Sequence, residues 1–167
     1  MLAQGTDGDF YGTTCGGADG GGTLFKLTPK GTLVVLHVFE GIGGLPGGYP
    51  GGQCAFGLTQ ATNGGFYGTT SSGGAAGAGV LFSLITRLGP FVTTLPVMGE
   101  IGDTVDILGT GLTGATGVNF NNTPAVFQAV LDSLISATVP SGITTGWVTV
   151  TAASGTLQSN VKFRVRR

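Results

Sequence analysis

The sequence predicts an all-β protein made of two units, residues 1–88 and residues 89–167. Three observations support this prediction. A glycine-rich segment occurs twice in the first half of the chain, short stretches rich in Thr, Val, Phe and Leu alternate with turn residues, and the alternation becomes cleaner after Pro90. Glycine supplies 34 of the 167 residues, but the glycines lie among apolar residues and only 9% of the chain is charged. We therefore expect an ordered protein with many tight turns rather than a disordered linker.

The first unit contains an internal repeat. Residues 7–27, DGDFYGTTCGGADGGGTLFKL, recur as residues 63–84, NGGFYGTTSSGGAAGAGVLFSL, with one inserted residue in the glycine run, and the preceding Leu2 recurs as Leu58. The Asp-Gly, Asn-Gly and Pro-Lys-Gly turns between these stretches are typical of antiparallel hairpins. The expected strands are residues 10–14, 23–28, 32–39, 56–62, 66–70 and 80–85.

The length of the repeat points to a particular architecture. A period of about 50 to 57 residues with four short strands is typical of one β-propeller blade. The chain holds about one and a half such blades, whereas a closed propeller needs about four to eight. The first unit is therefore predicted to be an incomplete β-propeller-like repeat. Because an incomplete repeat leaves a sheet edge open, we expect self-association or completion by further repeats.

The second unit is predicted to be an immunoglobulin-like β-sandwich. Short strands separated by turns at regular spacing, within about 75 residues, are typical of that fold. Along the last of these strands, Phe163 and Val165 point to one side, and the intervening Lys and Arg residues point to the other. The expected strands are residues 104–108, 117–120, 125–127, 134–139, 146–151 and 160–165.

Motifs in the first unit resemble a known family of repeats. These motifs are the FYGTT cores at residues 10–14 and 66–70, the glycine run before LFKLTP at residues 24–29, and the lead-in GLTQAT at residues 57–62. They resemble the GloVer-type tandem repeats of large secreted or surface-anchored bacterial proteins. The resemblance implies an extracellular repeat array with no assured activity.

The second unit resembles the IPT/TIG domain, which has an immunoglobulin-like fold. The resemblance depends on four segments: GDTVDILGTGL (102–112), ATGVNFNNTPA (115–125), ISATVPSGITTGWVTVT (135–151) and VKFRV (161–165). It implies the fold of residues 90–166. It leaves the function open, because the module occurs in receptors, in transcription factors and in the spacer regions of polysaccharide-active enzymes.

Charge and hydropathy argue against two kinds of partner. With a formal net charge of −1 and no basic stripe, the chain has no surface that would attract nucleic acid. The longest apolar run, residues 33–39, is interrupted by His37 and is shorter than the roughly 18 to 20 residues that a membrane-spanning helix needs. The start of the chain shows no signal peptide. The expected location, extracellular or at the cell surface, therefore depends on the family resemblance alone.

Few residues are candidates for catalysis. His37 is the only histidine and is the one side chain suited to act as a general base near neutral pH, although its place in an apolar strand favours a structural role. No serine lies in a Gly-x-Ser-x-Gly elbow. Cys15 beside two glycines is a candidate nucleophile, but a disulfide between Cys15 and Cys54, or two free buried thiols, is the favoured interpretation.

Three aspartates around the first FYGTT core are candidate calcium ligands. Asp7, Asp9 and Asp19 supply the oxygen ligands that calcium prefers. The spacing lacks the bidentate Glu of an EF-hand, and the second repeat does not conserve the carboxylates, so turn formation is the competing interpretation.

Aromatic side chains are a second kind of candidate. Tyr49 and Trp147 would stack on sugar rings if they are exposed, whereas Tyr11 and Tyr67 hold equivalent repeat positions and are expected in the core.

Three functions are compatible with these features. The first is a non-catalytic extracellular or surface module for adhesion, assembly or polysaccharide contact. The second is a calcium-dependent hydrolase of lactones or esters, by analogy with gluconolactonase-type propellers, in which a calcium ion polarises the carbonyl and activates water. The third is a structural subunit that assembles with itself through open sheet edges.

Overall fold

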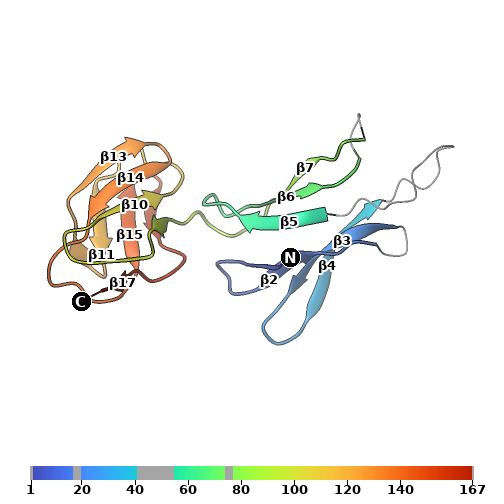
Figure 1. Ribbon diagram of the computed structural model, residues 1–167, viewed down its shortest axis with the longest axis horizontal. Helices are drawn as coiled ribbons and strands as arrows, with labels where there is room; N and C mark the ends of the chain where they lie inside the picture. The colour runs from blue at the N-terminus through green and yellow to red at the C-terminus, as the bar shows by residue number, and fades with distance from the viewer. Residues whose placement is uncertain (1, 17–19, 41–54, 74–76, 167) are drawn as a thin grey trace. The chain divides into compact units, whose positions relative to one another are not determined.

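The structure is a computed structural model, and it describes residues 2–16, 20–40, 55–73 and 77–166. The chain divides into two compact units, Met1–Leu88, here called the repeat unit, and Gly89–Arg167, here called the Ig-like unit. The described residues form strands and turns in both units (Figure 1). Among the described residues, no helix is long and apolar enough to cross a membrane.

The repeat unit contains two antiparallel sheets. The first has the order β1-β2-β3-β4 and the second the order β5-β6-β7. All six expected strands are present, and the short β1 is an addition to them. The described residues of this unit form these two sheets and no closed propeller. The bounds are β1 Leu2–Gln4, β2 Phe10–Thr13, β3 Gly20–Leu27, β4 Leu33–Glu40, β5 Ala55–Gln60, β6 Phe66–Thr70 and β7 Leu81–Leu84.

The glycine of each FYGTT core makes room for an aromatic ring on the neighbouring strand. Gly12 pairs with Phe25 and Gly68 pairs with Phe82 across the two hairpins. A Cβ atom on Gly12 would lie 2.6 Å from Cζ of Phe25, and one on Gly68 would lie 2.5 Å from Cζ of Phe82. Because these separations are far below van der Waals contact, a larger residue would displace the ring.

The glycine run of each repeat also contains one position at which the backbone conformation requires glycine. Gly22 and Gly79 have φ values of +84° and +96°. A Cβ atom at either position would overlap the carbonyl oxygen of Thr14 or Thr70, respectively. Glycine is therefore needed at both positions for conformation and for space.

The core of the repeat unit lies between its two sheets. The Tyr11 and Phe66 rings lie on each other with their centroids 4.2 Å apart. Oγ1 of Thr13 donates a hydrogen bond across the sheets to the carbonyl oxygen of Ala55, at 2.9 Å. We call the two surfaces that meet here the inner faces. Their buried residues are Tyr11, Leu24, Phe39, Ala55, Leu58 and Phe66.

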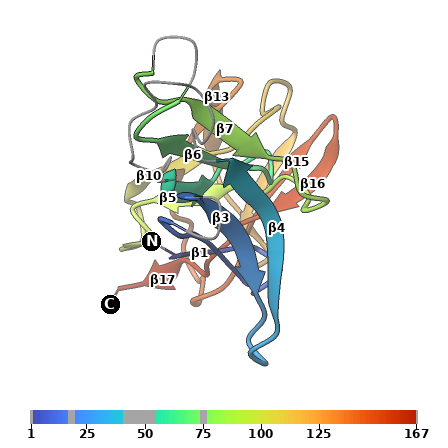
Figure 2. The same ribbon diagram turned by 90° about the vertical axis from the view of Figure 1, so that its right-hand side faces the viewer.

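The Ig-like unit is a sandwich of two four-stranded antiparallel sheets, β13-β14-β10-β8 and β12-β11-β15-β16, with a parallel pair formed by β9 and β17 (Figure 1). Strands β15, β16 and β17 of this unit are labelled in Figure 2. This agrees with the predicted sandwich. The bounds are β8 Thr93–Leu95, β9 Met98–Gly99, β10 Thr104–Leu108, β11 Gly117–Phe120, β12 Thr123–Pro124, β13 Phe127–Leu131, β14 Leu134–Thr138, β15 Val148–Ala152, β16 Gly155–Gln158 and β17 Arg164–Val165.

Some strand bounds in this unit differ from the prediction. The expected strand at 160–165 is confined to Arg164–Val165, and the hairpin partner of β15 is instead Gly155–Gln158. The reason lies at Ser159, which is buried: its Oγ accepts a hydrogen bond from the Val148 amide and donates one to the Val161 carbonyl. These bonds end β16 and turn the chain before β17, a side-chain effect that alternation of apolar residues does not reveal.

The core of the Ig-like unit comes mainly from the alternate residues of both sheets, as the predicted pattern required, and also from residues beside the strands such as Phe163. The Phe120 and Phe163 rings meet edge to face, with centroids 5.1 Å apart. Each large side chain buried in such a core contributes about 1.5–3 kcal/mol. The largest buried side chains are Phe120, Phe163, Ile107, Leu112, Ile135, Val92, Val105, Val118, Val139, Val148 and Val150.

Candidate functional site: the outer faces of the repeat unit

Asp7 and Asp9, two of the predicted calcium ligands, share a lysine in the structure. Nζ of Lys26 lies 3.3 Å from Oδ2 of Asp7 and also forms an ion pair with Oδ2 of Asp9. The hydrogen bond to Asp9, followed by the hydrogen bond to Asp7, raises the pKa of Lys26 above its usual value. Asp19 lies outside the described residues. Because a cation from the chain itself lies between the two carboxylates, their geometry favours an ion pair over a metal site.

The pairing that brings Lys26 to this position was not foreseen from the sequence. Tyr11 and Lys26 are directly opposite each other on β2 and β3. Burial raises the pKa of Asp7, but hydrogen bonds from the Tyr11 hydroxyl, the Asp9 amide and Lys26 outweigh it and leave the pKa of Asp7 below its usual value. Among the described residues, no three His, Cys, Asp or Glu side chains form a group that could hold a metal ion.

His37 lies on β4 and is exposed. Its ring contacts Phe39 edge to face, with centroids 4.8 Å apart. It lines a hollow of about 260 Å³ whose other described lining residues are mainly apolar: Leu24, Leu36, Phe39, Phe82, Ser83 and Leu84. No carboxylate is among these lining residues to orient the imidazole as a base.

Two further predicted sites involve residues outside the described part of the chain. Cys15, which follows β2, is disulfide-bonded. Cys54, the other cysteine of the sequence, lies outside the described residues, and so does Tyr49. The pairing of Cys15 with Cys54 and the ligand role of Tyr49 therefore stay predictions.

Trp147 lies before β15 in the Ig-like unit and is 39% exposed. Nζ of Lys162 lies 5.5 Å from the centroid of its ring, within the range of a cation–π interaction.

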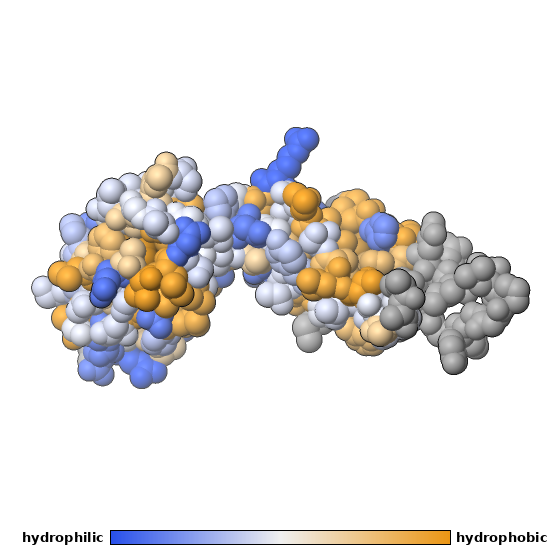
Figure 3. All heavy atoms as spheres, turned by 90° about the horizontal axis from the view of Figure 1, so that it is seen from above, coloured by the Kyte–Doolittle hydropathy of each residue, from blue (hydrophilic) through white to orange (hydrophobic). Residues whose placement is uncertain are grey.

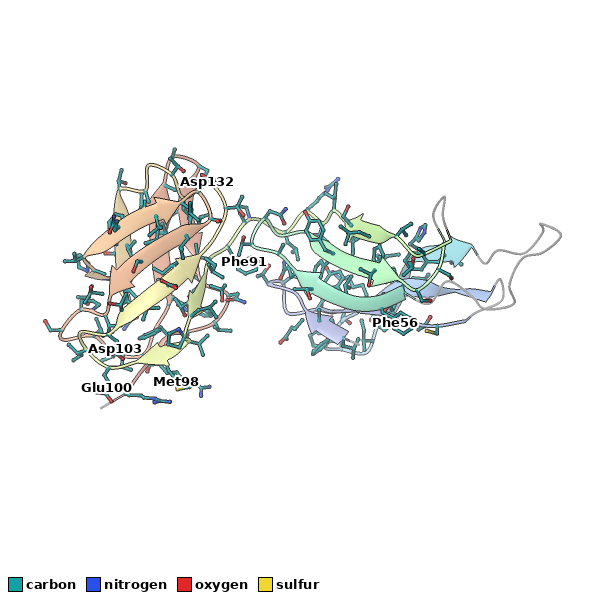
Figure 4. The ribbon with its side chains drawn as sticks, turned by 45° about the horizontal axis from the view of Figure 1, so that its top comes forward. Phe56, Phe91, Met98, Glu100, Asp103 and Asp132 are labelled. Atoms are coloured by element: carbon teal, nitrogen blue, oxygen red, sulfur yellow. The ribbon has the colours of Figure 1, made fainter. Side chains whose placement is uncertain are left out.

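A hollow of about 420 Å³ lies elsewhere on this unit, beside Glu100, Thr144 and Arg166. Glu100 lies at the same end of the unit as Met98 and Asp103, and Asp132 lies at the opposite end (Figure 4).

The second sheet has one buried and one exposed face. Along β6, Phe66, Gly68 and Thr70 are buried, whereas Tyr67 and Thr69 are exposed. Directly opposed residues on neighbouring strands share a face, so the exposed face continues onto β5 and β7. We call this surface the outer face of the second sheet. Its exposed members are Phe56, Thr59, Tyr67, Thr69, Leu81 and Ser83, and Phe56 is labelled in Figure 4.

The first sheet also has an outer face, on the side away from the core. Phe10 is opposite Leu27, and Leu2 is opposite Gly12. Apolar side chains gather over the repeat unit in Figure 3. The apolar members of the outer face of the first sheet are Leu2, Phe10, Phe25, Leu27, Leu33 and Val35, of which Leu2, Leu33 and Val35 are exposed.

The expectation that Tyr11 and Tyr67 both belong to the core is correct only for Tyr11. Tyr67 is on the outer face of the second sheet, and its hydroxyl accepts a hydrogen bond from Nδ2 of Asn63 at 2.8 Å. Contiguous apolar residues on the surface of a folded unit mark an interaction site more often than scattered ones do. The two outer faces are therefore the strongest candidate site in the described part of the repeat unit.

Comparison with known proteins identifies the second unit. The IPT/TIG domain family matches residues 90–165. Residues 90–165 form an IPT/TIG domain. The immunoglobulin-like sandwich expected from the resemblance is thereby confirmed for this domain. The comparisons give no support for the GloVer-type repeats expected in residues 1–88.

A solved structure and the curated proteins complete the comparison. The chain is similar to a gamma-CGTase from Alkalophilic bacillus clarkii, with 19% identity and a TM-score of 0.41 over 93% of this chain. The chain spans 26% of the length of that protein. None of the curated proteins matches the chain.

Proposed function

We propose that the chain is a non-catalytic extracellular or cell-surface module that takes part in a larger assembly through its repeat unit. One observation carries this proposal: both sheets of the repeat unit expose apolar side chains on the faces that point away from their common core. Burying such side chains is favourable by about 25 cal/mol per Å² of apolar surface. The IPT/TIG domain, with its own core, serves in this proposal as a second folded unit of the same chain.

Strand β4 supports the same proposal. It is the last strand of the first sheet and pairs with β3 alone among the described strands. Leu33, Val34, Val35, Leu36 and Val38 of this strand are all exposed, so apolar side chains occupy both of its faces. A strand that is apolar on both faces is typical of one covered on both sides. An uncovered apolar edge strand is also a template for pairing with another chain.

The molar mass of the chain in solution tests this proposal. Light scattering across a range of concentrations is expected to give a molar mass above that of one chain. This mass should rise with the concentration of the chain. A chelator should leave this mass unchanged, since the proposed contact is apolar and Asp7 and Asp9 are already paired with Lys26. A mass equal to one chain at every concentration would contradict the proposal.

Polysaccharide contact at Trp147 is a second candidate function. The exposed ring of Trp147 offers an apolar surface on which a sugar can stack, and Lys162 beside it offers a hydrogen-bond donor. Trp147 is the only tryptophan, so intrinsic fluorescence reports on this position directly. Titration with soluble neutral and acidic polysaccharides should change the emission, and Lys162→Ala should weaken the response. An emission that no polysaccharide alters would exclude this site.

A further inference from the structure

The two outer faces of the repeat unit use the same repeat positions as the two inner faces. In the second repeat, Tyr67 and Leu81 correspond to Tyr11 and Leu24 of the first. In the other direction, Leu2 of the first repeat corresponds to Leu58 of the second. The outer face of the second sheet therefore presents the repeat positions that form the inner face of the first sheet. Likewise, the outer face of the first sheet presents the repeat positions that form the inner face of the second.

The corresponding residues differ strongly in exposure. Leu24 is 3% exposed and Leu81 is 74% exposed. Leu58 is 3% exposed and Leu2 is 56% exposed. The repeat unit thus contains one complete contact between two sheets in its interior. On its outside it carries two separate surfaces that are equivalent to the two sides of that contact.

The interior contact shows what the two halves can form. Phe66 lies on the ring of Tyr11, and the residue that corresponds to Phe66 is Phe10, on the outer face of the first sheet. Tyr67 is also oriented as Tyr11 is: the hydroxyl of Tyr11 is hydrogen-bonded to Asp7, and that of Tyr67 to Asn63, at the corresponding position. The tyrosine of the open half is therefore already held in place for packing.

We propose that a second copy of this chain is the partner, and that its first sheet packs by its outer face on the outer face of the second sheet. This inference rests on the proposed assembly function and specifies the surfaces and the occupant. In the complex, Tyr67 of one copy lies on Phe10 of the next, as Tyr11 lies on Phe66 within the chain. A second copy is sufficient as the partner because each chain carries both halves of the contact.

The charges of the two surfaces agree with their burial in such a contact. On the inner face of the first sheet, Lys26 is paired with Asp7 and Asp9. The corresponding positions in the second repeat are neutral: Ser83, Asn63 and Gly65, respectively. The outer face of the second sheet can therefore be covered without burying a charge that lacks a partner.

The contact has a defined symmetry. Two different surfaces meet, so the interface is heterologous and leaves one unused half at each end of a dimer. Further copies then add to the unused halves. They form a ring if the rotation between neighbouring copies closes, and a filament without limit if it does not. This behaviour separates the proposal from pairing between two β4 edges, in which one surface meets its own copy and assembly stops at a dimer.

Complementation between two single variants tests the proposal. Leu81→Glu destroys one half of the contact and Leu2→Glu the other, and both positions are exposed enough to accept a carboxylate in a single chain. Each variant alone is expected to lose assembly and to give the mass of one chain. An equimolar mixture should give twice that mass and no more, since one intact half remains on each variant. Val126→Glu, at an exposed residue of the IPT/TIG domain, should assemble like the unaltered chain.

The outcomes separate failure of this inference from failure of the proposed function. If the unaltered chain has the mass of one chain at all concentrations, both are wrong. If the unaltered chain assembles and both single variants still do so, the proposed function stands and the contact is elsewhere. If each variant is a single chain and the mixture also stays so, the two surfaces do not meet each other and the head-to-tail contact is wrong.

Discussion

The hydroxyl of Tyr11 donates a hydrogen bond to Oδ2 of Asp7, with 2.9 Å between the two oxygens. The same carboxylate is in contact with Lys26, and the Tyr11 ring lies against Phe66 in the core. One side chain thus connects the turn before β2 to the packing of the two sheets.

Replacing this hydroxyl should cost stability. Tyr11→Phe is expected to lower the free energy of unfolding of the repeat unit by about 1 kcal/mol, because it removes one hydrogen bond in a part-buried setting. Hydrogen exchange of the β2 and β3 amides measures this unit separately from the IPT/TIG domain. Tyr67→Phe is the matched control, since its hydrogen bond to Asn63 is exposed, and should have a smaller effect. Equal effects of the two substitutions would contradict this account.

The stability of the repeat unit should depend on pH through Asp7. The hydrogen bonds described above hold the pKa of Asp7 below its usual value of about 4, so the unfolded chain binds a proton more readily than the folded chain. The stabilisation is therefore present above pH of about 4 and is lost as the pH falls through the lower pKa of the folded state. An acid titration followed by circular dichroism should show this loss, and Asp7→Asn should flatten it. If Asp7→Asn loses stability at low pH as the unaltered chain does, the assignment to Asp7 is wrong.

Leu24 and Leu81 give a direct comparison of one residue type in two environments. Leu24→Ala should destabilise the repeat unit by about 2–5 kcal/mol, because it leaves a cavity in the core. Leu81→Ala should change stability by less than about 0.5 kcal/mol at concentrations where the chain is monomeric, since the side chain is exposed. Chemical denaturation of both variants at low concentration provides the measurement. A large effect of Leu81→Ala under these conditions would show that this face is covered within a single chain.

Gly79 should be intolerant of a side chain. Gly79→Ala is expected to lower the melting temperature of the repeat unit, since the new Cβ atom would overlap the carbonyl oxygen of Thr70 and the φ of +96° is strained for alanine. Gly77→Ala is the control, because Gly77 also has a positive φ but has no atom within 4 Å of the added Cβ position. Scanning calorimetry should show the larger shift for Gly79→Ala, and the reverse order would disprove the steric argument.

Thr94 offers a stabilising substitution in the IPT/TIG domain. Its Oγ1 is buried and has no hydrogen-bond partner in the described part of the chain. Thr94→Val keeps the shape and removes the unpaired hydroxyl, so the free energy of unfolding should rise by about 1 kcal/mol. Trp147 fluorescence during urea denaturation reports on this domain. A decrease in stability would mean that the hydroxyl has a partner in solution.

The sequence predicted the β-strands well and the exposure of individual residues poorly, for a physical reason. Alternation and turn residues are local, so the six repeat strands and the sandwich could be recognised from them. The exposure of Tyr67 depends on whether a neighbouring sheet covers it, and the repeated motif is nearly the same at Tyr11, which is covered, and at Tyr67, which is not. Positions that are equivalent in the two repeats therefore lie on equivalent faces of their sheets. The repeat alone does not determine which of these faces is buried.

The ion pair at the candidate metal site was not visible in the sequence for a related reason. Asp7 and Asp9 are close in sequence, but the cation that pairs with them is Lys26, which reaches them through the register of β2 against β3. Register depends on which side chains oppose each other across a hairpin, and it is not visible in the spacing of the aspartates alone.

The parallel strand contacts near the two ends of the IPT/TIG domain have a mechanical consequence. Val92 bridges Ser159, and β9 pairs with β17 in parallel, through backbone hydrogen bonds such as that from the Arg166 amide to the Gly99 carbonyl at 2.8 Å. A force that pulls residues 89 and 166 apart loads these hydrogen bonds along the strands and breaks them together, rather than opening them one at a time. The domain should therefore resist stretching, and single-molecule extension that unfolds it at negligible force would contradict this.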